Sequence, residues 1–320
     1  FGVSSNGNFE GGNILHVADG NDVDSNAIEQ AKAMLLRKRE QRVKPGRDEK
    51  ILASWNGLML ASLAEAACAL GRRDYLAAAI ANCSFLLKSM VVDGNLKHCY
   101  KDGKVREEGY LQDYAMVIGG LLALHQATLQ SEWLRHAISL AETMVEKFWD
   151  KQNNMFYDTM FEHQNLFIRP RSFFDEALPC GSSTAISVML KLARITDNEF
   201  WQQVAFQSLS SVIHLIPQYP LGLSNWLCAL DFYLSSPREI VIVGRKDDAA
   251  TSELLHTVCS AWIPNKMVVG YNPDEPVQLS ALKLFQGRQM VNNQPTAYVC
   301  QGYTCKQPVT DAALLGHLLQ

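Results

Sequence analysis

The chain has 320 residues, of which 48% are hydrophobic and 19% are charged, and its formal net charge is −4 at pH 7. This balance is typical of a folded globular protein with a large core, and it excludes extended disorder. The small negative charge argues against nucleic acid or an anionic membrane as the main partner. No apolar run approaches the roughly 18 residues of a membrane span, so we expect a soluble protein.

The start of the chain and its cysteines bear on the compartment. The sequence opens with Phe1 in a Gly/Asn-rich segment, so we expect it to be the carboxy-terminal part of a larger protein, with any targeting segment outside it. Its eight cysteines are too sparse for a disulfide framework, and Cys68, Cys83 and Cys228 fall among apolar helix residues. This usage favours a reducing, cytoplasmic compartment.

Most of the chain is expected to form helices that follow one another in pairs. We expect helices at 25–43, 55–70, 74–90, 111–129, 132–149, 182–195, 199–216 and 223–234. Ser54 offers an N-cap for the second helix, and Gly71 ends it. The dipeptides Asp93-Gly94 and Asp102-Gly103 predict a short β-hairpin. Residues 155–169 form a second extended excursion between helical pairs.

The two helices of each pair differ in their hydrophobic pattern. LMLASLAEAACAL and AMVIGGLLAL carry little charge on any face, whereas EWLRHAISLAETMVEKFW gathers its charges on one side. A helix that is apolar all round belongs inside a protein, and an amphipathic helix belongs at its surface. This alternation predicts a mainly α fold, an (α/α) barrel of helical hairpins that is incomplete in this chain.

The pattern changes after Pro237. The short apolar run REIVIVG is typical of a buried strand and is followed by an expected helix at 247–262 and two further runs, KMVVGY and TAYVCQG. Alternating strands and helices predict a small α/β unit with a parallel sheet. We therefore expect a helical region at 1–236 and a C-terminal unit at 237–320.

Several segments together resemble one protein family. They are NFEGGNILH (8–16), KPGRDEKILASWNGLML (44–60), EEGYLQDYAMVIGGLLAL (107–124), DEALPCGSSTA (175–185) and YVCQGYTCKQPV (298–309). In this order they resemble the spermatogenesis-associated protein 20 family, which is related to bacterial thioredoxin-domain proteins. The resemblance implies a six-hairpin glycosidase-like barrel, preceded in full-length members by a thioredoxin-like domain that is absent from this chain.

The inner helices of such a barrel run parallel, so their N-termini meet at one mouth, where unpaired backbone N–H groups carry a partial positive charge. Acidic and aromatic residues recur just before these helices, and a sugar site requires both. The expected acid/base or hydroxyl-binding residues are Asp48, Asp113 and Asp175. The expected substrate-binding residues are Arg47, Trp55, Asn56, Tyr114, Ser182 and Trp226. The alternative is that the acids are helix caps and the tryptophans core residues.

Other chemistry receives little support. The histidines are dispersed without metal-ligand spacing, so no metal is expected, and none of them matches the acid/base histidines of sugar epimerases with similar barrels. No Gly-rich fingerprint follows Gly244, so no cofactor is expected. Cys300 and Cys305 lack the two-residue spacing of a redox pair, which favours a structural or incidental role.

Two functions remain open. The first is a carbohydrate-related protein that binds or acts on a sugar-like small molecule at the barrel mouth, with glycosidase- or epimerase-like activity undecided. The alternative is a non-catalytic interaction module that accompanies the thioredoxin-like domain. An open, acid-lined mouth favours the first function, and a mouth plugged by residues 155–169 favours the second.

Overall fold

The computed structural model describes residues 1–16, 24–162, 166–275, 282–302 and 304–320. They form two compact units, Phe1–Glu49 and Lys50–Gln320. The first unit contains α1 (Ser25–Glu40), whose N-terminus is capped by the Asp24 carboxylate. Its last turn carries Arg37, Lys38 and Arg39, which complement the negative end of the helix dipole. No residue of α1 is buried within this structure.

The second unit holds the remaining elements. Its helices are α2 (Ala53–Leu70), α3 (Arg73–Phe85), η1 (Leu86–Met90, a π turn), α4 (Leu111–Thr128), α5 (Ser131–Phe148), α6 (Gly181–Thr196), α7 (Glu199–Val212), α8 (Ser224–Leu234), α9 (Ala249–Ser260), η3 (Lys283–Phe285, a 3₁₀ turn) and α10 (Ala312–Leu319). Its strands are β1 (Ile51–Leu52), β2 (Val91–Val92), β3 (Asn95–Lys101), β4 (Lys104–Glu108), β5 (Trp149–Asp150), β6 (Met155–Phe156), β7 (Glu239–Val243), β8 (Met267–Tyr271), β9 (Thr296–Gln301) and β10 (Thr304–Cys305). The predicted fold class, mainly α with a small C-terminal α/β unit, is confirmed.

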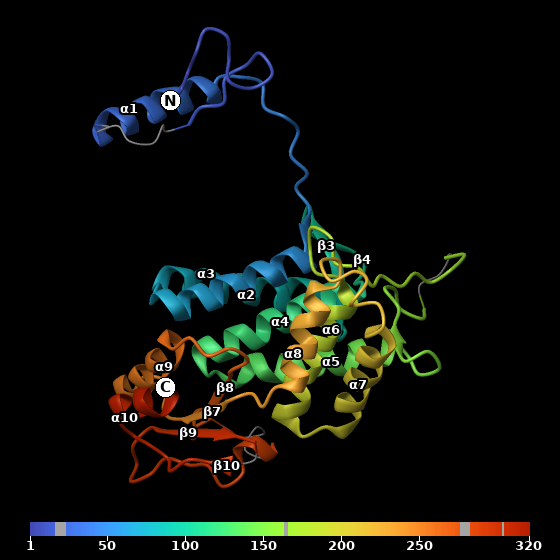
Figure 1. The fold of residues 1–320 in the computed structure, drawn as a ribbon, viewed down its shortest axis with the longest axis vertical. Helices are drawn as coiled ribbons and strands as arrows, with labels where there is room; N and C mark the ends of the chain where they lie inside the picture. The colour runs from blue at the N-terminus through green and yellow to red at the C-terminus, as the bar shows by residue number, and fades with distance from the viewer. Residues whose placement is uncertain (17–23, 163–165, 276–281, 303) are drawn as a thin grey trace. The chain divides into compact units, whose positions relative to one another are not determined.

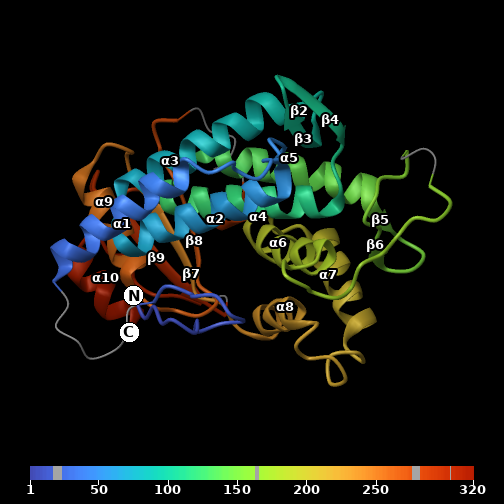
Figure 2. The same cartoon turned by 90° about the horizontal axis from the view of Figure 1, so that it is seen from above.

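The helices pack as hairpins around a row of inner helices (Figures 1 and 2). The hairpins are α2 with α3, α4 with α5, and α6 with α7, and the first helices pack in the succession α2, α4, α6, α8. Helix α4 is buried over most of its length, whereas α5 is buried along one face. This is the arrangement of inner and outer helices that the apolar and amphipathic patterns predicted, and no closed ring is identified among the described residues.

Helices α2 and α4 approach each other closely through two glycines. A Cβ atom added at Gly57 would lie 2.6 Å from the backbone carbon of Met116. One added at Gly120 would lie 2.7 Å from the carbonyl oxygen of Gly57. Non-bonded carbon atoms pack at about 3.5–4.0 Å, so any larger side chain at these positions would force the helices apart.

The start of α2 differs from the sequence prediction. The helix begins at Ala53 with Leu52 at the N-cap position, so Ser54 is not its N-cap. The backbone N–H of Ser54 instead donates a hydrogen bond to the Asp113 carboxylate of α4, at 3.0 Å. A side chain from a neighbouring inner helix therefore supplies the acceptor that a local cap would have provided. The end at Gly71, in the left-handed conformation, is as predicted.

The C-terminal sheet has the strand order β10-β9-β7-β8. Strands β7 and β8 are parallel and are joined through α9, but β9 is antiparallel to both β7 and β10. The prediction of a parallel sheet is therefore right for one strand pair and wrong for the others. A parallel neighbour needs a long crossover, usually a helix. The described part of the connection from β8 to β9 contains only the three-residue turn η3.

The two faces of this sheet pack against different partners. Ile240 and Ile242 of β7 contact α9 and α10 residues in a small separate core, whereas Val241 and Val243 join the main core of the helical hairpins. Alternate residues of a strand point to opposite faces, so one short strand connects the two cores. In Figure 1 this sheet lies at one end of the inner helices, and β3 and β4 lie at the other.

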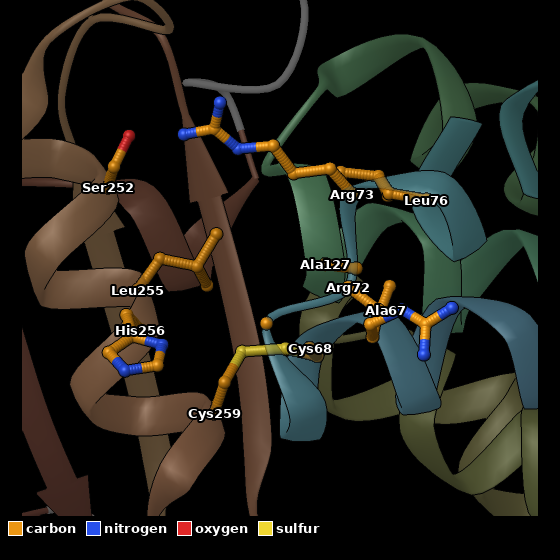
Figure 3. A pocket seen from close by; sticks show the side chains of 11 residues that line it. Ala67, Cys68, Arg72, Arg73, Leu76, Ala127, Ser252, Leu255, His256 and Cys259 are labelled. Carbon is orange, nitrogen blue, oxygen red and sulfur yellow. A yellow bond between two sulfur atoms is a disulfide. The ribbon is translucent and has the colours of Figure 1, made fainter.

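Four of the eight cysteines form two disulfides. Cys68 of α2 is bonded to Cys259 of α9, with Cα atoms 5.3 Å apart, beside a cavity of 220 Å³ (Figure 3). Cys300 is bonded to Cys305 across β9 and β10. The expectation that Cys68 is a small apolar side chain is therefore wrong, because it covalently joins two helices. Cys83 is free and buried, as expected, whereas Cys228 is free but exposed.

The predicted boundary at residue 237 stays a prediction. Within the described ranges, no helix is both long and apolar enough to cross a membrane.

Candidate functional site

The N-termini of the inner helices are joined by side-chain hydrogen bonds. The Asp113 carboxylate of α4 accepts from the backbone N–H of Ser54 in α2. The Asp175 carboxylate accepts from the backbone N–H of Asn225 in α8 at 2.8 Å, and the Asn225 amide donates to the Ser183 hydroxyl of α6 at 2.9 Å. The four helix starts therefore share one mouth, as the parallel arrangement predicted.

A pocket of about 450 Å³ opens at this mouth. Its walls come from β3, from the segment that begins α4, from the chain after β6 and from the segment that begins α6. The lining residues are His98, Tyr110, Gln112, Asp113, Asp158, Ser172, Phe174 and residues 176–181. Polar groups from four segments converge on one concave space, the arrangement expected of a small-molecule site.

His98 and Asp113 form the most defined contact of the pocket. Nδ1 of His98 lies 2.9 Å from Oδ2 of Asp113, with the imidazole 23% and the carboxylate 1% exposed. The hydrogen bond to the carboxylate raises the pKa of His98, against the opposing effect of partial burial. The Tyr110 ring packs edge-on against the imidazole, with the two ring centroids 4.8 Å apart. His98 is therefore a fixed imidazole that can give or accept a proton inside the pocket.

The Asp113 carboxylate is engaged by three groups of the protein. Besides Ser54 and His98, it accepts from the backbone N–H of Tyr110 at 2.9 Å, reaching back over the first turn of α4. The carboxylate therefore joins two helix starts and orients the imidazole. Its position matches the predicted rim, but its contacts are those of a positioning residue.

Asp175 has a similar set of contacts and does not line the pocket. One carboxylate oxygen accepts from the backbone N–H of Cys180 at 2.9 Å and from the Ser183 hydroxyl at 3.0 Å. The other accepts from Asn225 of α8. Asp175 therefore holds the starts of α6 and α8 together, which is the capping alternative weighed from the sequence.

Two other carboxylates face the pocket. The exposed Glu176 carboxylate has no hydrogen bond or ion pair among the described residues. Asp158 accepts from the Ser172 hydroxyl at 2.7 Å and from the Ser172 backbone N–H at 3.2 Å, which leaves acceptor capacity on its oxygens. The half-exposed Phe174 packs edge-on against Tyr219 at 5.5 Å. Acceptors beside an aromatic ring are the groups that bind the hydroxyls and the apolar face of a sugar.

Three predicted ligand-binding residues lie in the core instead. Tyr114, Ser182 and Trp226 are each 1% exposed or less. The Tyr114 hydroxyl accepts from the backbone N–H of Leu96 at 2.9 Å, and burial raises its pKa to about 12. The Trp226 indole donates to the carbonyl of Phe173 at 2.9 Å. These contacts stabilise the helix starts and offer no surface to a ligand.

The other predicted residues lie outside the pocket lining. Trp55 is 60% exposed on α2, and the Asn56 amide donates to the carbonyl of Leu52 at 2.8 Å. Arg47 belongs to the first unit, where its guanidinium pairs with the Glu49 carboxylate at 2.6 Å. Asp48 belongs to the same unit, and the roles of Arg47 and Asp48 at the mouth stay predictions.

Sequence reasoning left His98 without a role, although the turn sequence carried a signal. The Asp102-Gly103 turn fixes the register of β3 and β4, with Tyr100 opposite Val105 and Lys97 opposite Glu108. His98 must then lie level with residue 107, a few residues before α4 begins. Its pairing with Asp113 was not readable, because that depends on how the hairpin packs on the helix. Within the described ranges, no group of His, Cys, Asp and Glu side chains is arranged to hold a metal ion.

Comparison with known proteins tests the family resemblance. No family model matches the chain. It is 32% identical to spermatogenesis-associated protein 20 of Homo sapiens over 297 residues, which is 89% of this chain and 38% of that protein. The rat protein of the same name is 30% identical over 98% of this chain and 43% of its own length. The chain is a relative of spermatogenesis-associated protein 20. It spans less than half the length of these relatives.

Solved structures with partial likeness include sugar-processing enzymes. The GH76 α-mannanase of Bacteroides thetaiotaomicron has a TM-score of 0.47 and 16% identity, covering 74% of this chain and 68% of that one. The cellobiose 2-epimerase of Spirochaeta thermophila has a TM-score of 0.43 and 14% identity, covering 60% and 55%. These likenesses concern the arrangement of helices and not activity.

Proposed function

We propose that this chain binds, and transforms by proton transfer, a sugar-like small molecule in the pocket at the inner-helix N-termini. The observation that carries the proposal is the His98–Asp113 pair in the wall of a 450 Å³ pocket. An imidazole oriented by a buried carboxylate is a proton donor and acceptor suited to neutral pH. The proposal gives the buried acid a positioning role and the histidine the chemical one.

The ligand chemistry follows from the lining. The carboxylates of Glu176 and Asp158 accept hydrogen bonds from hydroxyl groups and disfavour an anionic ligand. Phe174 and Tyr110 supply ring faces and edges for the apolar side of a sugar ring. A neutral, polyhydroxylated ligand fits this combination best. Epimerase-like chemistry suits it more closely than hydrolysis, because the oriented titratable group is an imidazole and not a carboxylate.

The test is a thermal-shift screen of neutral mono- and disaccharides, followed by calorimetric titration of each hit. A ligand at about 100 times its Kd stabilises a protein by roughly 2.7 kcal/mol, which gives a readable shift. We expect His98→Gln to weaken binding of a hit about tenfold, which corresponds to about 1.4 kcal/mol. Glu176→Gln should weaken it, because one of the two acceptor oxygens is replaced by an amide donor.

Glu253→Gln is the matched control, because it makes the same change at an exposed carboxylate of α9 that does not line the pocket. Binding that is equally strong in wild type, His98→Gln and Glu176→Gln would place the ligand elsewhere and overturn the proposal. The absence of a thermal shift with every sugar tested would also overturn the proposal. The alternative of an interaction module beside a thioredoxin-like domain stays a prediction, and its test is binding of such a domain.

A further inference from the structure

A second site, independent of the pocket above, lies where β9 and β10 pair. Cys300 and Cys305 stand directly opposite each other in this antiparallel pair and are joined by a disulfide. Cys300 is 2% exposed, whereas Cys305 is exposed. One sulfur is therefore open to an incoming thiol, and the other is sheltered.

A guanidinium group lies against both sulfurs. Nη2 of Arg288 is 3.1 Å from Sγ of Cys300 and 3.4 Å from Sγ of Cys305. The same side chain donates to the carbonyl of Leu284, and the carbonyl of Arg288 accepts from the Tyr271 hydroxyl at 2.7 Å. Arg288 is thus held in place by contacts that do not involve the cysteines. A fixed cation beside a cysteine favours its thiolate, the reactive form in disulfide exchange.

The disulfide also faces a cavity. A space of about 490 Å³ is lined by both cysteines and Arg288, and its other walls come from α6, α7, α8, β7 and η3. Leu190 and Leu234 give it apolar surface, and Arg194 and Glu239 form an ion pair at 3.5 Å within it. The cavity gives a thiol-bearing group room to approach the exposed sulfur.

The other disulfide of the chain shows the contrast. Cys68 and Cys259 are 191 residues apart in sequence and join two helices, so their bond restrains the unfolded chain strongly. Cys300 and Cys305 are 5 residues apart in a hairpin whose strands are already paired. Among the described residues, hydrogen bonds to a disulfide sulfur occur only at this second bond. Its position adds little to stability and favours reactivity.

We propose that Cys300–Cys305 is a redox-active disulfide that accepts electrons from a dithiol entering the adjoining cavity. A thiolate of the dithiol attacks Sγ of Cys305, which forms a mixed disulfide and releases Cys300 as a thiolate beside Arg288. The second thiolate of the dithiol then attacks the dithiol's first sulfur, which is bonded to Cys305 in the mixed disulfide, and releases Cys305 as a thiolate. Two electrons and two protons pass from the dithiol to the cysteine pair, and the dithiol becomes a disulfide.

The experiment is reduction of the folded chain by graded dithiothreitol, with thiols trapped by alkylation and assigned by peptide mass spectrometry. We expect Cys300–Cys305 to be reduced about tenfold faster than Cys68–Cys259 in native protein, because its exposed sulfur and adjacent cation assist exchange. Circular dichroism should show that the fold persists after this first reduction.

Arg288 variants separate a redox role from a structural one. After reduction, the alkylation rate of Cys300 should rise with a midpoint at lower pH than that of an ordinary thiol. Arg288→Gln should move this midpoint to higher pH. Arg288→Lys keeps the charge and should restore most of the effect. Arg245→Gln, at an arginine that pairs with Asp274 outside the cavity lining, is the matched control and should leave the profile unchanged.

Two results would overturn the proposal. One is reduction of Cys300–Cys305 only together with unfolding, at the rate of Cys68–Cys259. The other is a pH profile that is the same in wild type, Arg288→Gln and Arg245→Gln.

Discussion

A histidine lies at each end of helix α4, His98 of β3 beside its start and His125 in its last turn, and the two environments are opposite. At the N-terminal end, His98 lies in the wall of an open pocket and pairs with the Asp113 carboxylate, which raises its pKa. At the C-terminal end, His125 is completely buried against the C-terminal sheet. Its Nδ1 donates to the carbonyl of Gln130 at 2.9 Å, and its Nε2 accepts from the backbone N–H of Gly270 at 3.4 Å. Burial lowers the pKa of His125 to about 4.

The difference shows how one helix separates stability from chemistry. The neutral His125 joins α4 to β8 through both ring nitrogens, and charging it would break that junction. In the described part of the chain, the second ring nitrogen of His98 has no hydrogen-bond partner, and the contact with Asp113 stabilises the charged ring. The sealed end of the helix fixes the fold, and the open end presents a titratable group.

The largest expected effect is at Asp113. Asp113→Ala removes the acceptor of the backbone N–H groups of Ser54 and Tyr110 and the partner of His98. Breaking a buried pair in this way typically costs about 3–5 kcal/mol, and we expect a loss of that order in urea unfolding. Asp247→Ala, in an exposed loop, is the control and should change stability by less than about 0.5 kcal/mol. A loss at Asp113 as small as that of the control would contradict the assigned contacts.

His125 should set the acid sensitivity of the fold. Its ordinary pKa is 6.5 and its folded pKa is about 4. Between these values, the residue is protonated in the unfolded chain but neutral in the folded chain. Stability should therefore fall as pH falls through this window, by up to about 3 kcal/mol. His125→Gln should be less stable at neutral pH but flatter between pH 6.5 and 4, as measured by urea midpoints. An unchanged slope in this variant would show that another group is responsible.

The smallest effect is expected at His98, with the opposite sign. Its folded pKa is raised by Asp113, so its contribution to stability is present below pH 6.5 and is lost as pH rises through the folded value. Partial exposure makes this contribution smaller than that of His125. An NMR titration should place the His98 pKa above 6.5, and Asp113→Asn should lower it. If His98 titrates at the same pH in both proteins, Asp113 does not raise its pKa.

Local pattern was enough to predict most of the helical architecture. Helices with little charge on any face, such as α4, have to be buried over most of their surface, and α5 with its single charged face has to lie outside, so the order of the layers follows from sequence. Gly71 and the Asp102-Gly103 turn mark boundaries by their own backbone conformations. The convergence of helix starts then follows from parallel packing.

Features that depend on tertiary contact could not be predicted from sequence. Asp113 looks like any acid in a first helical turn, and only the approach of α2 and of β3 shows that its carboxylate is bonded to both. Cys68 reads as an apolar helix residue until α9 is placed beside it. The direction of β9 depends on the connection from β8, whose described part contains only the short turn η3.

The Cys68–Cys259 bond changes what a break in the backbone can do to this molecule. It turns residues 68–259 into a covalent circle, which contains the helices from α3 to α8, strand β7 and α9 up to Cys259. A single cut within the circle, for example beside the fully exposed Phe167, opens the circle without separating its parts. The helical hairpins and the sheet would remain one molecule until the sulfur bridge was reduced.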